Sequence, residues 1–164
     1  MVFRGRNVAA LFAAISLTVI GAVPASAVRS GSNPFPSRST DRGSRIVRTA
    51  LSFRGARYRY GGTGRHGFDC SGFTKYLYGK SEGVGLPRTA AQQYHSGRKV
   101  AWNDIKPGDL LFFSTHGRRV GHVGVYAGNG KMVHAANPRR GVTIDNPFSG
   151  YWARRLVGIR RPVA

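Results

Sequence analysis

Residues 58–73 read YRYGGTGRHGFDCSGF, and this stretch decides how the chain folds. A glycine-rich loop leads to Asp69, which is followed at once by Cys70 and then by apolar residues such as Phe73 at helical spacing. Aspartate is a preferred N-cap residue because its carboxylate accepts hydrogen bonds from the first free backbone amides. The stretch therefore predicts a loop followed by a helix that begins at Cys70 and ends near Gly79.

Cys70 is the single cysteine of the chain, so no internal disulfide can form. A lone cysteine can serve as an intermolecular link, as an inert buried residue or as a reactive thiol. At a helix N-terminus, the helix dipole and the unpaired amides favour negative charge, which lowers the pKa of a thiol. The position of Cys70 thus favours a reactive thiolate.

The N-terminal residues have the features of a secretory signal. The chain starts with Arg4 and Arg6 and no acid, continues with apolar residues over 8–23, and then reads Ala-Ser-Ala. This order predicts a signal peptide over 1–27. A membrane anchor is the alternative, but the apolar stretch is short for a span of roughly 20 residues. We therefore expect a secreted, extracellular or wall-associated protein with no stable membrane anchor after cleavage.

The remaining chain divides into a leader and one domain. Residues 28–40 are rich in Ser, Pro and Gly and predict a disordered leader or linker, and residues 41–164 predict the domain. Helical patterns cover 41–54 and 90–95. Short β-rich runs then follow at 109–113, 120–126, 131–135, 142–145 and 151–159. Helices followed by an antiparallel sheet predict an α+β fold.

Two histidines are placed to act together. Asn129-Gly130 is a tight hairpin signal, and it separates the strands that carry His122 and His134. With the turn near 128–129, the two residues would lie close to opposite one another and project from the same face. One imidazole could then take the proton of the Cys70 thiol while the other orients it.

The chain is strongly basic, with 26 Lys and Arg against six Asp and Glu and a net charge of +20. Such a surface attracts polyanions through its long-range field. For a secreted protein, anionic wall polymers and carboxylate-rich peptides are the expected partners, and nucleic acid is not expected.

Several motifs in order resemble the NlpC family of cell-wall endopeptidases. The segment from Tyr58 to Phe73 is similar to its nucleophile motif. Further similarity lies in the runs Leu86–Thr89 with Gln92-Gln93, Pro107–Phe113, Gly121–Gly128 and Met132–Ala135. The resemblance spans roughly 45–161 and implies a papain-like α+β fold, with N-terminal helices packed on a C-terminal antiparallel sheet.

The resemblance also implies a function and a role for each site residue. It implies hydrolysis of peptidoglycan stem peptides at the γ-D-glutamyl–diamino acid bond by a monomeric enzyme without cofactor or metal. Cys70 would be the nucleophile, His122 the base and His134 its orienting partner. Tyr58 would help to bind the oxyanion, and Asp69 and Ser71 would bind the substrate amine. Asp69 could equally act only as a helix cap.

Three other readings of the sequence stay open. The first is a thiol amidase or acyltransferase on the same fold. The second is a non-catalytic, basic module that binds the cell wall. The third is a metal site formed by Cys70, His122 and His134, although their spacing does not match the usual zinc-finger patterns.

Overall fold

The computed structural model describes residues 38–162, so the predicted signal peptide and residues 28–37 of the predicted leader lie outside the described residues. The first helix, α1 (Arg38–Ser52), begins at Arg38 rather than at Asp41. Ile46 and Ala50 of this helix are buried, whereas Leu51 is 41% exposed. Between residues 38 and 162, no helix has the length and apolar character that a membrane span requires.

The second helix, α2 (Cys70–Glu82), begins at the predicted residue and is longer than predicted. Gly79 lies inside it, and the helix ends at Gly83, which adopts the left-handed conformation with φ of 68°. The short α3 (Ala90–Tyr94) is closed at its start by a capping box between Thr89 and Gln92. A 3-10 turn, η1 (Trp102–Asp104), and the short α4 (Gly150–Ala153) complete the described helices.

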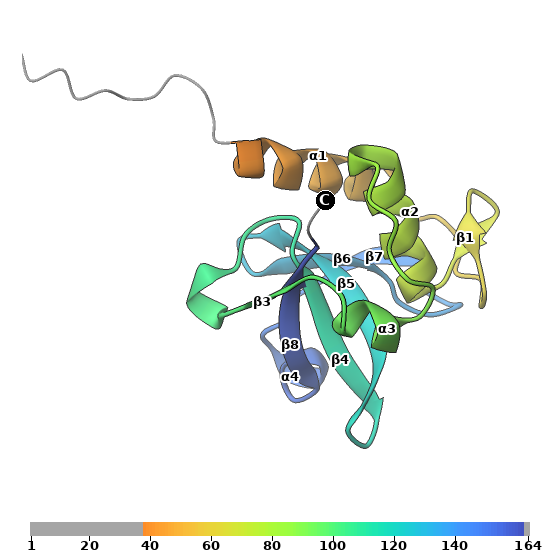
Figure 1. Cartoon of the computed structure of the whole chain (residues 1–164). Helices are drawn as coiled ribbons and strands as arrows, with labels where there is room; N and C mark the ends of the chain where they lie inside the picture. Colours follow the sequence, from red (N-terminus) through yellow and green to blue (C-terminus); the bar gives the residue numbers. More distant parts are fainter. Residues whose placement is uncertain (1–37, 163–164) are drawn as a thin grey trace, which may run out of the picture. The chain divides into compact units, whose positions relative to one another are not determined.

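Six strands form one antiparallel sheet in the order β3-β8-β4-β5-β6-β7 (Figure 1). They are β3 (Arg98–Val100), β4 (Leu110–His116), β5 (Arg119–Gly128), β6 (Lys131–Ala135), β7 (Val142–Asp145) and β8 (Leu156–Arg161). A separate small hairpin joins β1 (Thr63–Gly64) to β2 (Gly67–Phe68) within the glycine-rich loop. The predicted α+β class is confirmed, with helices packed on an antiparallel sheet.

One predicted strand was wrong at its start. Residues 151–159 were expected to be extended throughout, but Gly150–Ala153 form α4 and only Leu156–Arg161 pair as β8. The edge strand β3, which the sequence did not predict, pairs with β8 through contacts such as Val100 with Ile159. A three-residue run with two exposed basic side chains carries too little alternation to be recognised as a strand.

The sheet has apolar residues on both faces. One face packs against α1 and α2, and its cluster includes Phe73 and Leu77 of α2 with Phe112 and Val125 of the sheet. The other face carries a second cluster, which includes Leu111, Phe113, Tyr126 and Met132 and is packed by Trp152. Strand alternation therefore separates Phe112 from Phe113, and both are fully buried.

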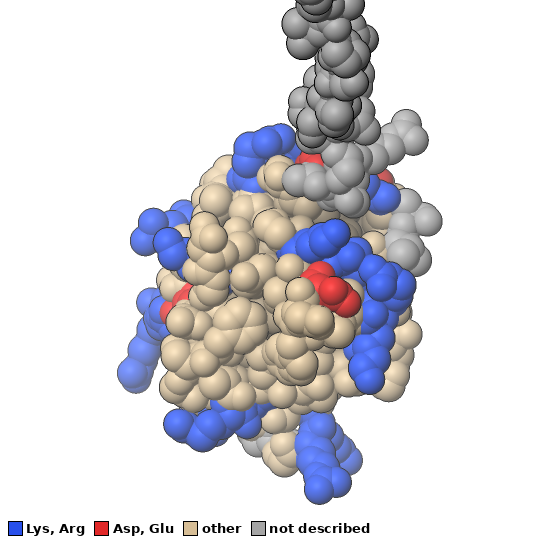
Figure 2. All heavy atoms as spheres, turned by 90° about the vertical axis from the view of Figure 1, so that its left-hand side faces the viewer, with Lys and Arg blue, Asp and Glu red and all other residues tan. Residues whose placement is uncertain are grey.

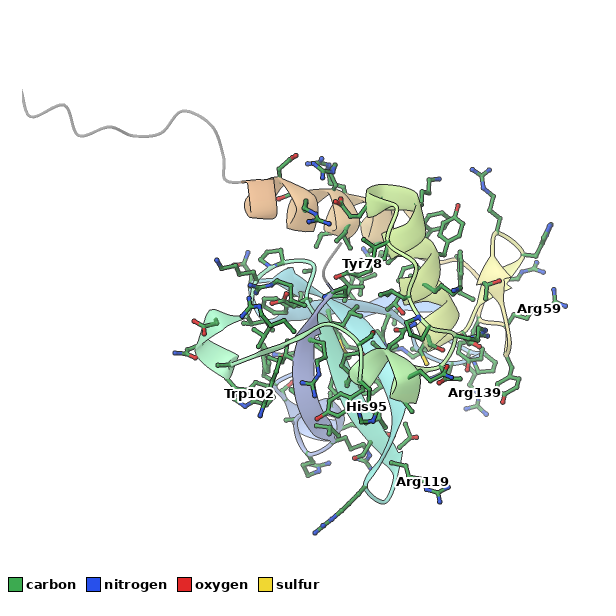
Figure 3. All side chains as sticks on the ribbon, in the orientation of Figure 1. Arg59, Tyr78, His95, Trp102, Arg119 and Arg139 are labelled. Atoms are coloured by element: carbon green, nitrogen blue, oxygen red, sulfur yellow. The ribbon has the colours of Figure 1, made fainter. Side chains whose placement is uncertain are left out.

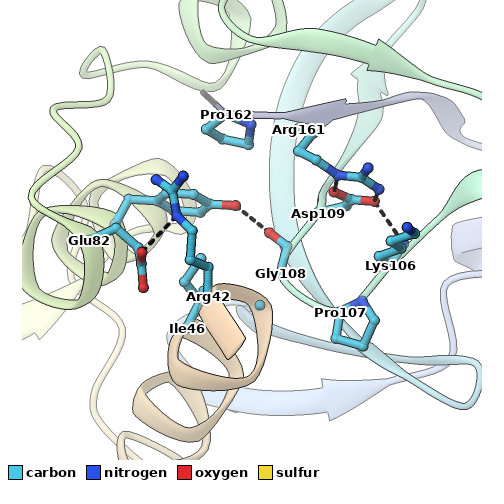
Figure 4. A pocket seen from close by; sticks show the side chains of 11 residues that line it. Arg42, Ile46, Glu82, Lys106, Pro107, Gly108, Asp109, Arg161 and Pro162 are labelled. Atoms are coloured by element: carbon cyan, nitrogen blue, oxygen red, sulfur yellow. Dashed lines mark hydrogen bonds and ion pairs between the residues drawn. The ribbon is translucent and has the colours of Figure 1, made fainter. Parts of the chain in front are cut away.

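A pocket between α1, α2 and the start of β4 is lined by residues that make polar contacts with one another (Figure 4). Asp109, which is 1% exposed, accepts hydrogen bonds from Arg161 at 2.6 and 2.7 Å. The Tyr78 hydroxyl, buried between α2 and the sheet, donates to the carbonyl of Gly108. These contacts fix the end of β8 and the C-terminal half of α2 to the start of β4.

We predict that Arg161→Ala lowers the free energy of unfolding by about 3–5 kcal/mol, because it leaves the buried Asp109 carboxylate without its cation. Chemical denaturation of the purified variant measures this loss. Arg119→Ala is the matched control, since Arg119 is exposed and points away from the molecule (Figure 3), and it should change stability by no more than about 0.5 kcal/mol. Equal effects of the two variants would contradict the account.

Candidate active site

The thiol of Cys70 lies at the first residue of α2. Asp69 caps this helix, since its Oδ1 accepts the Gly72 amide at 2.7 Å. Its other oxygen, Oδ2, accepts the Gly61 amide at 2.9 Å, which ties the glycine-rich loop to the helix start. The N-cap expected for Asp69 is thus present, and it fixes where the thiol projects.

Arg88 completes the surroundings of Asp69. Its guanidinium pairs with both carboxylate oxygens and also donates to the Ser71 hydroxyl at 3.1 Å. Burial alone would raise the pKa of Asp69, but Arg88 and the two backbone amides hold it below its usual value. Asp69 is therefore an ionised cap, and binding of a substrate amine by Asp69 and Ser71 stays a prediction.

The backbone around Tyr58 lies against Phe68, two residues before Cys70. Tyr58 bridges to Phe68 in parallel, and the Arg59 amide donates to the Phe68 carbonyl at 2.9 Å. Burial, followed by the nearby Cys70 and Asp69, raises the pKa of the Tyr58 hydroxyl. The hydroxyl is therefore a hydrogen-bond donor at neutral pH, as its predicted role at the oxyanion requires.

A β-bulge brings strand β5 to the thiol. Phe113 pairs with His122 while the next residue, Ser114, pairs with Val120, so Gly121 is the extra residue. The Cys70 Sγ lies 3.9 Å from the carbonyl oxygen of Gly121. A Cβ at Gly121 would lie 1.9 Å from the Thr115 Oγ1, so a larger residue in this bulge would require the Thr115 side chain to move.

His122 and His134 are in direct contact. The Nε2 of His122 lies 2.7 Å from the Nδ1 of His134. The predicted common face is therefore present, but the predicted opposition was wrong. Val125 pairs with Val133, which makes His122 a diagonal neighbour of His134 rather than its direct partner. The turn lies further along the chain than residues 128–129, so the register of β5 and β6 differs from the predicted one. Because the shift is an even number of residues, both rings stay on the same face of the sheet.

Gly124 gives the two rings the room to meet. It lies between them on the same face, and a Cβ there would come within 3.2 Å of the His134 Cβ. With no side chain at that point, the imidazoles close the diagonal with ring centroids 5.0 Å apart. His122 also stacks on Trp152 at 4.8 Å, and it is only 6% exposed.

The contacts continue past His134 to an acid that the sequence did not single out. The His134 Nε2 lies 3.1 Å from the Oδ2 of Asp145. Asp145 also accepts from Arg140 at 2.6 and 2.8 Å and from the Trp152 indole N–H at 2.9 Å. Asp145 pairs with Met132 across β6 and β7, and Met132 stands two residues before His134 on the same face. The alternation of side chains along β7, which places Asp145 on the same face of the sheet as His134, was the signal that could have identified this residue.

The electrostatics of the site differ from the expected thiolate. Burial raises the pKa of the Cys70 thiol, although the amides of Val123 and Ser71 oppose this effect. Burial, together with His134, lowers the pKa of His122 to about 3. Burial lowers the pKa of His134 to about 4 against the opposing effect of Asp145. The prediction of a lowered thiol pKa was wrong, because desolvation outweighs the helix N-terminus.

Two further histidines, His66 and His95, lie outside this cluster. His66 is exposed in the glycine-rich loop, and His95 is exposed at the end of α3. Within residues 38–162, no group of three or more His, Cys, Asp or Glu is arranged to hold a metal ion. What the described residues bring together is a thiol, two neutral imidazoles and an ionised carboxylate.

Comparison with known proteins agrees with this geometry. Residues 55–161 match the model of the NlpC/P60 family. The chain is 44% identical over 116 residues to the probable endopeptidase p60 of Listeria innocua, covering 71% of this chain and 24% of that protein. It is 42% identical over 118 residues to the gamma-DL-glutamyl hydrolase of Bacillus subtilis, covering 71% of this chain and 28% of that protein. The chain thus spans about a quarter of the length of these curated relatives.

A solved structure is similar over nearly its whole length. The NlpC/P60 domain of the peptidoglycan hydrolase SagA superposes with a TM-score of 0.64 at 32% identity, covering 73% of this chain and 97% of that domain. The family model covers all of the site residues from Tyr58 to Trp152. The resemblance seen in the sequence motifs is confirmed, and the chain belongs to the NlpC/P60 family.

Proposed function

We propose that the protein is a peptidoglycan hydrolase that cuts stem peptides with Cys70 as nucleophile. The observation that carries this proposal is the buried contact of 2.7 Å between His122 and His134, next in β5 to Gly121, whose carbonyl oxygen lies 3.9 Å from the Cys70 sulfur. The site supplies a nucleophile, a neutral base and a partner that orients the base. The names of the relatives support the substrate class, since they include an endopeptidase, a gamma-DL-glutamyl hydrolase and a peptidoglycan hydrolase.

The mechanism follows from the two pKa directions. In the resting site the thiol is protonated and both imidazoles are neutral. When a substrate carbonyl arrives, the sulfur–carbon bond forms as the thiol proton moves to His122. The amine then leaves with that proton as the carbon–nitrogen bond breaks, and water hydrolyses the thioester with His122 again as base. The Cys70 backbone amide and the Tyr58 hydroxyl are the proposed donors to the oxyanion.

We further propose that the target is the γ-D-glutamyl–diamino acid bond. The relative named for γ-glutamyl hydrolysis supports this choice. The same name and the net charge of +20 also favour a second candidate, an anionic γ-glutamyl polymer. Amide hydrolysis or acyl transfer elsewhere in the wall remains the alternative on the same fold.

We predict that Cys70→Ala and His122→Ala both reduce digestion of diaminopimelate-type peptidoglycan to background, because each removes a partner in the first proton transfer. Mass analysis of the released fragments identifies the bond that is cut. The matched control is His95→Ala, which alters an exposed histidine at the end of α3 and should keep wild-type activity. An unchanged product profile in Cys70→Ala would refute the cysteine mechanism.

A second prediction concerns the resting thiol. Because burial raises its pKa, Cys70 should react with iodoacetamide more slowly than free cysteine at pH 7, and the rate should rise only as the solution becomes alkaline. Alkylation followed by intact-mass measurement across pH 5–10 tests this. Rapid alkylation at pH 5–7 would instead show a thiolate–imidazolium pair.

The basic surface supports retention on the cell wall. Lys and Arg side chains border the face shown in Figure 2, where acidic side chains occupy only small areas. We propose that this charge holds the secreted protein on anionic wall polymers, without a nucleic-acid partner or an oligomer being needed.

We expect Cys70→Ala to bind purified wall at low ionic strength and to be released at high salt, since exposed charges are screened within about 10 Å at 0.1 M. Sedimentation with wall at several salt concentrations measures this. Using the inactive variant separates binding from digestion. Binding that does not change with salt would contradict the charge-based retention.

A further inference from the structure

We propose that Asp145 is a positioning residue that fixes the tautomers of both site histidines and so leaves the Nδ1 of His122 free to accept the thiol proton. This inference rests on the proposed function and extends the site by a residue that does not touch the reacting atoms. The geometry that carries it is the unbroken line of contacts from Asp145 through His134 to His122.

The tautomers follow from counting donors and acceptors. An ionised carboxylate can only accept hydrogen bonds, so the His134 Nε2 facing Asp145 must carry the proton. In a neutral imidazole the other nitrogen is then an acceptor, and the His134 Nδ1 must receive its hydrogen bond from the His122 Nε2. His122 therefore carries its proton on Nε2, and its Nδ1 keeps the lone pair. If the group at position 145 donated a hydrogen bond instead of accepting one, each imidazole would carry its proton on the other ring nitrogen.

Asp145 is held ionised and in place by its own neighbours. Burial alone would raise its pKa, but hydrogen bonds from Arg140 and Trp152 lower it to about 2. The carboxylate is therefore ionised, and only an acceptor, at neutral pH. The Trp152 indole joins the two ends of the line, because its N–H binds Asp145 while its ring stacks on His122 at 4.8 Å.

Arg140 makes the carboxylate an orienting group rather than a source of negative charge. It forms two hydrogen bonds to Asp145, and its positive charge lowers the pKa of His134. The pair is close to neutral overall, so Asp145 can direct the tautomer without protonating the histidines. Burial is the main reason that both imidazoles stay neutral, and at His134 the charge of Arg140 adds to it although a carboxylate lies 3.1 Å away.

Among the described residues, few charged or titratable groups lie near the two imidazoles. Cys70 comes from α2, Asp145 from β7 and Arg140 from the turn before β7. The strand β4 and helix α4 pack the uncharged rings of Phe113 and Trp152 against His122. A change in pH response after substitution at Asp145 or Arg140 can therefore be assigned to this line.

The test uses three substitutions in the full chain. In Asp145→Leu the acceptor is lost, and kcat/KM on a stem peptide should fall about 100-fold or more. In Asp145→Asn a carbonyl can still accept from His134 and Trp152, so the loss should stay within about tenfold. In Arg140→Met the carboxylate is left without its cation, so the pH at which activity is lost on acidification should move upward. Arg139→Met is the matched control, since Arg139 is the adjacent exposed arginine and it is the guanidinium of Arg140 that binds Asp145.

Nitrogen NMR of histidine-labelled protein gives a readout that does not depend on hydrolysis. In the wild type and in Asp145→Asn, both site histidines should carry hydrogen on Nε2, whereas Asp145→Leu should show mixed tautomers in a protein that still melts cooperatively. If the wild type cuts no stem peptide, the proposed function fails, and the tautomers still decide this inference. Equal activity of the Leu and Asn variants, or Nδ1-protonated histidines in the wild type, would overturn it.

Discussion

The burial of two imidazoles against each other on one face of the sheet is the constraint on which the rest of the site depends. His122 is 6% exposed and His134 is fully buried, so charging either ring carries a desolvation cost. Both rings are therefore neutral, and the neighbouring thiol has no imidazolium to hold it ionised. The thiol proton must therefore move while the sulfur attacks the substrate. The hydrogen-bond partners of the two rings determine which ring nitrogen can accept it.

The fold meets this constraint mainly through its backbone. A bulge at Gly121 brings a strand carbonyl to 3.9 Å from the Cys70 sulfur, and the missing side chain at Gly124 lets the rings meet on the diagonal. On the helix side, Asp69 caps α2 and is itself held by Arg88. Two separate polar clusters thus hold the site residues, one at the start of α2 around Asp69 and one past His134 around Asp145.

Sequence alone predicted those parts of the site that depend on local rules. The start of α2 follows from Asp69 before Cys70, and the common face of the two histidines survives a wrong register because the error was an even number of residues. The predicted direction of the Cys70 pKa shift was wrong. The place of a residue in a helix can be read from the sequence, whereas its burial depends on how distant segments pack. Asp145 was missed because its contact with His134 depends on the register of a third strand. The helix α4 was missed because four residues make too few turns for a periodic pattern.

Neutron diffraction from a crystal grown near pH 7 tests the central claim most directly, because X-ray data at ordinary resolution do not locate these protons. The account predicts deuterium on the Cys70 sulfur and on the Nε2 of both His122 and His134, with none on the His122 Nδ1. A bare sulfur beside a His122 ring that carries deuterium on both nitrogens would contradict it.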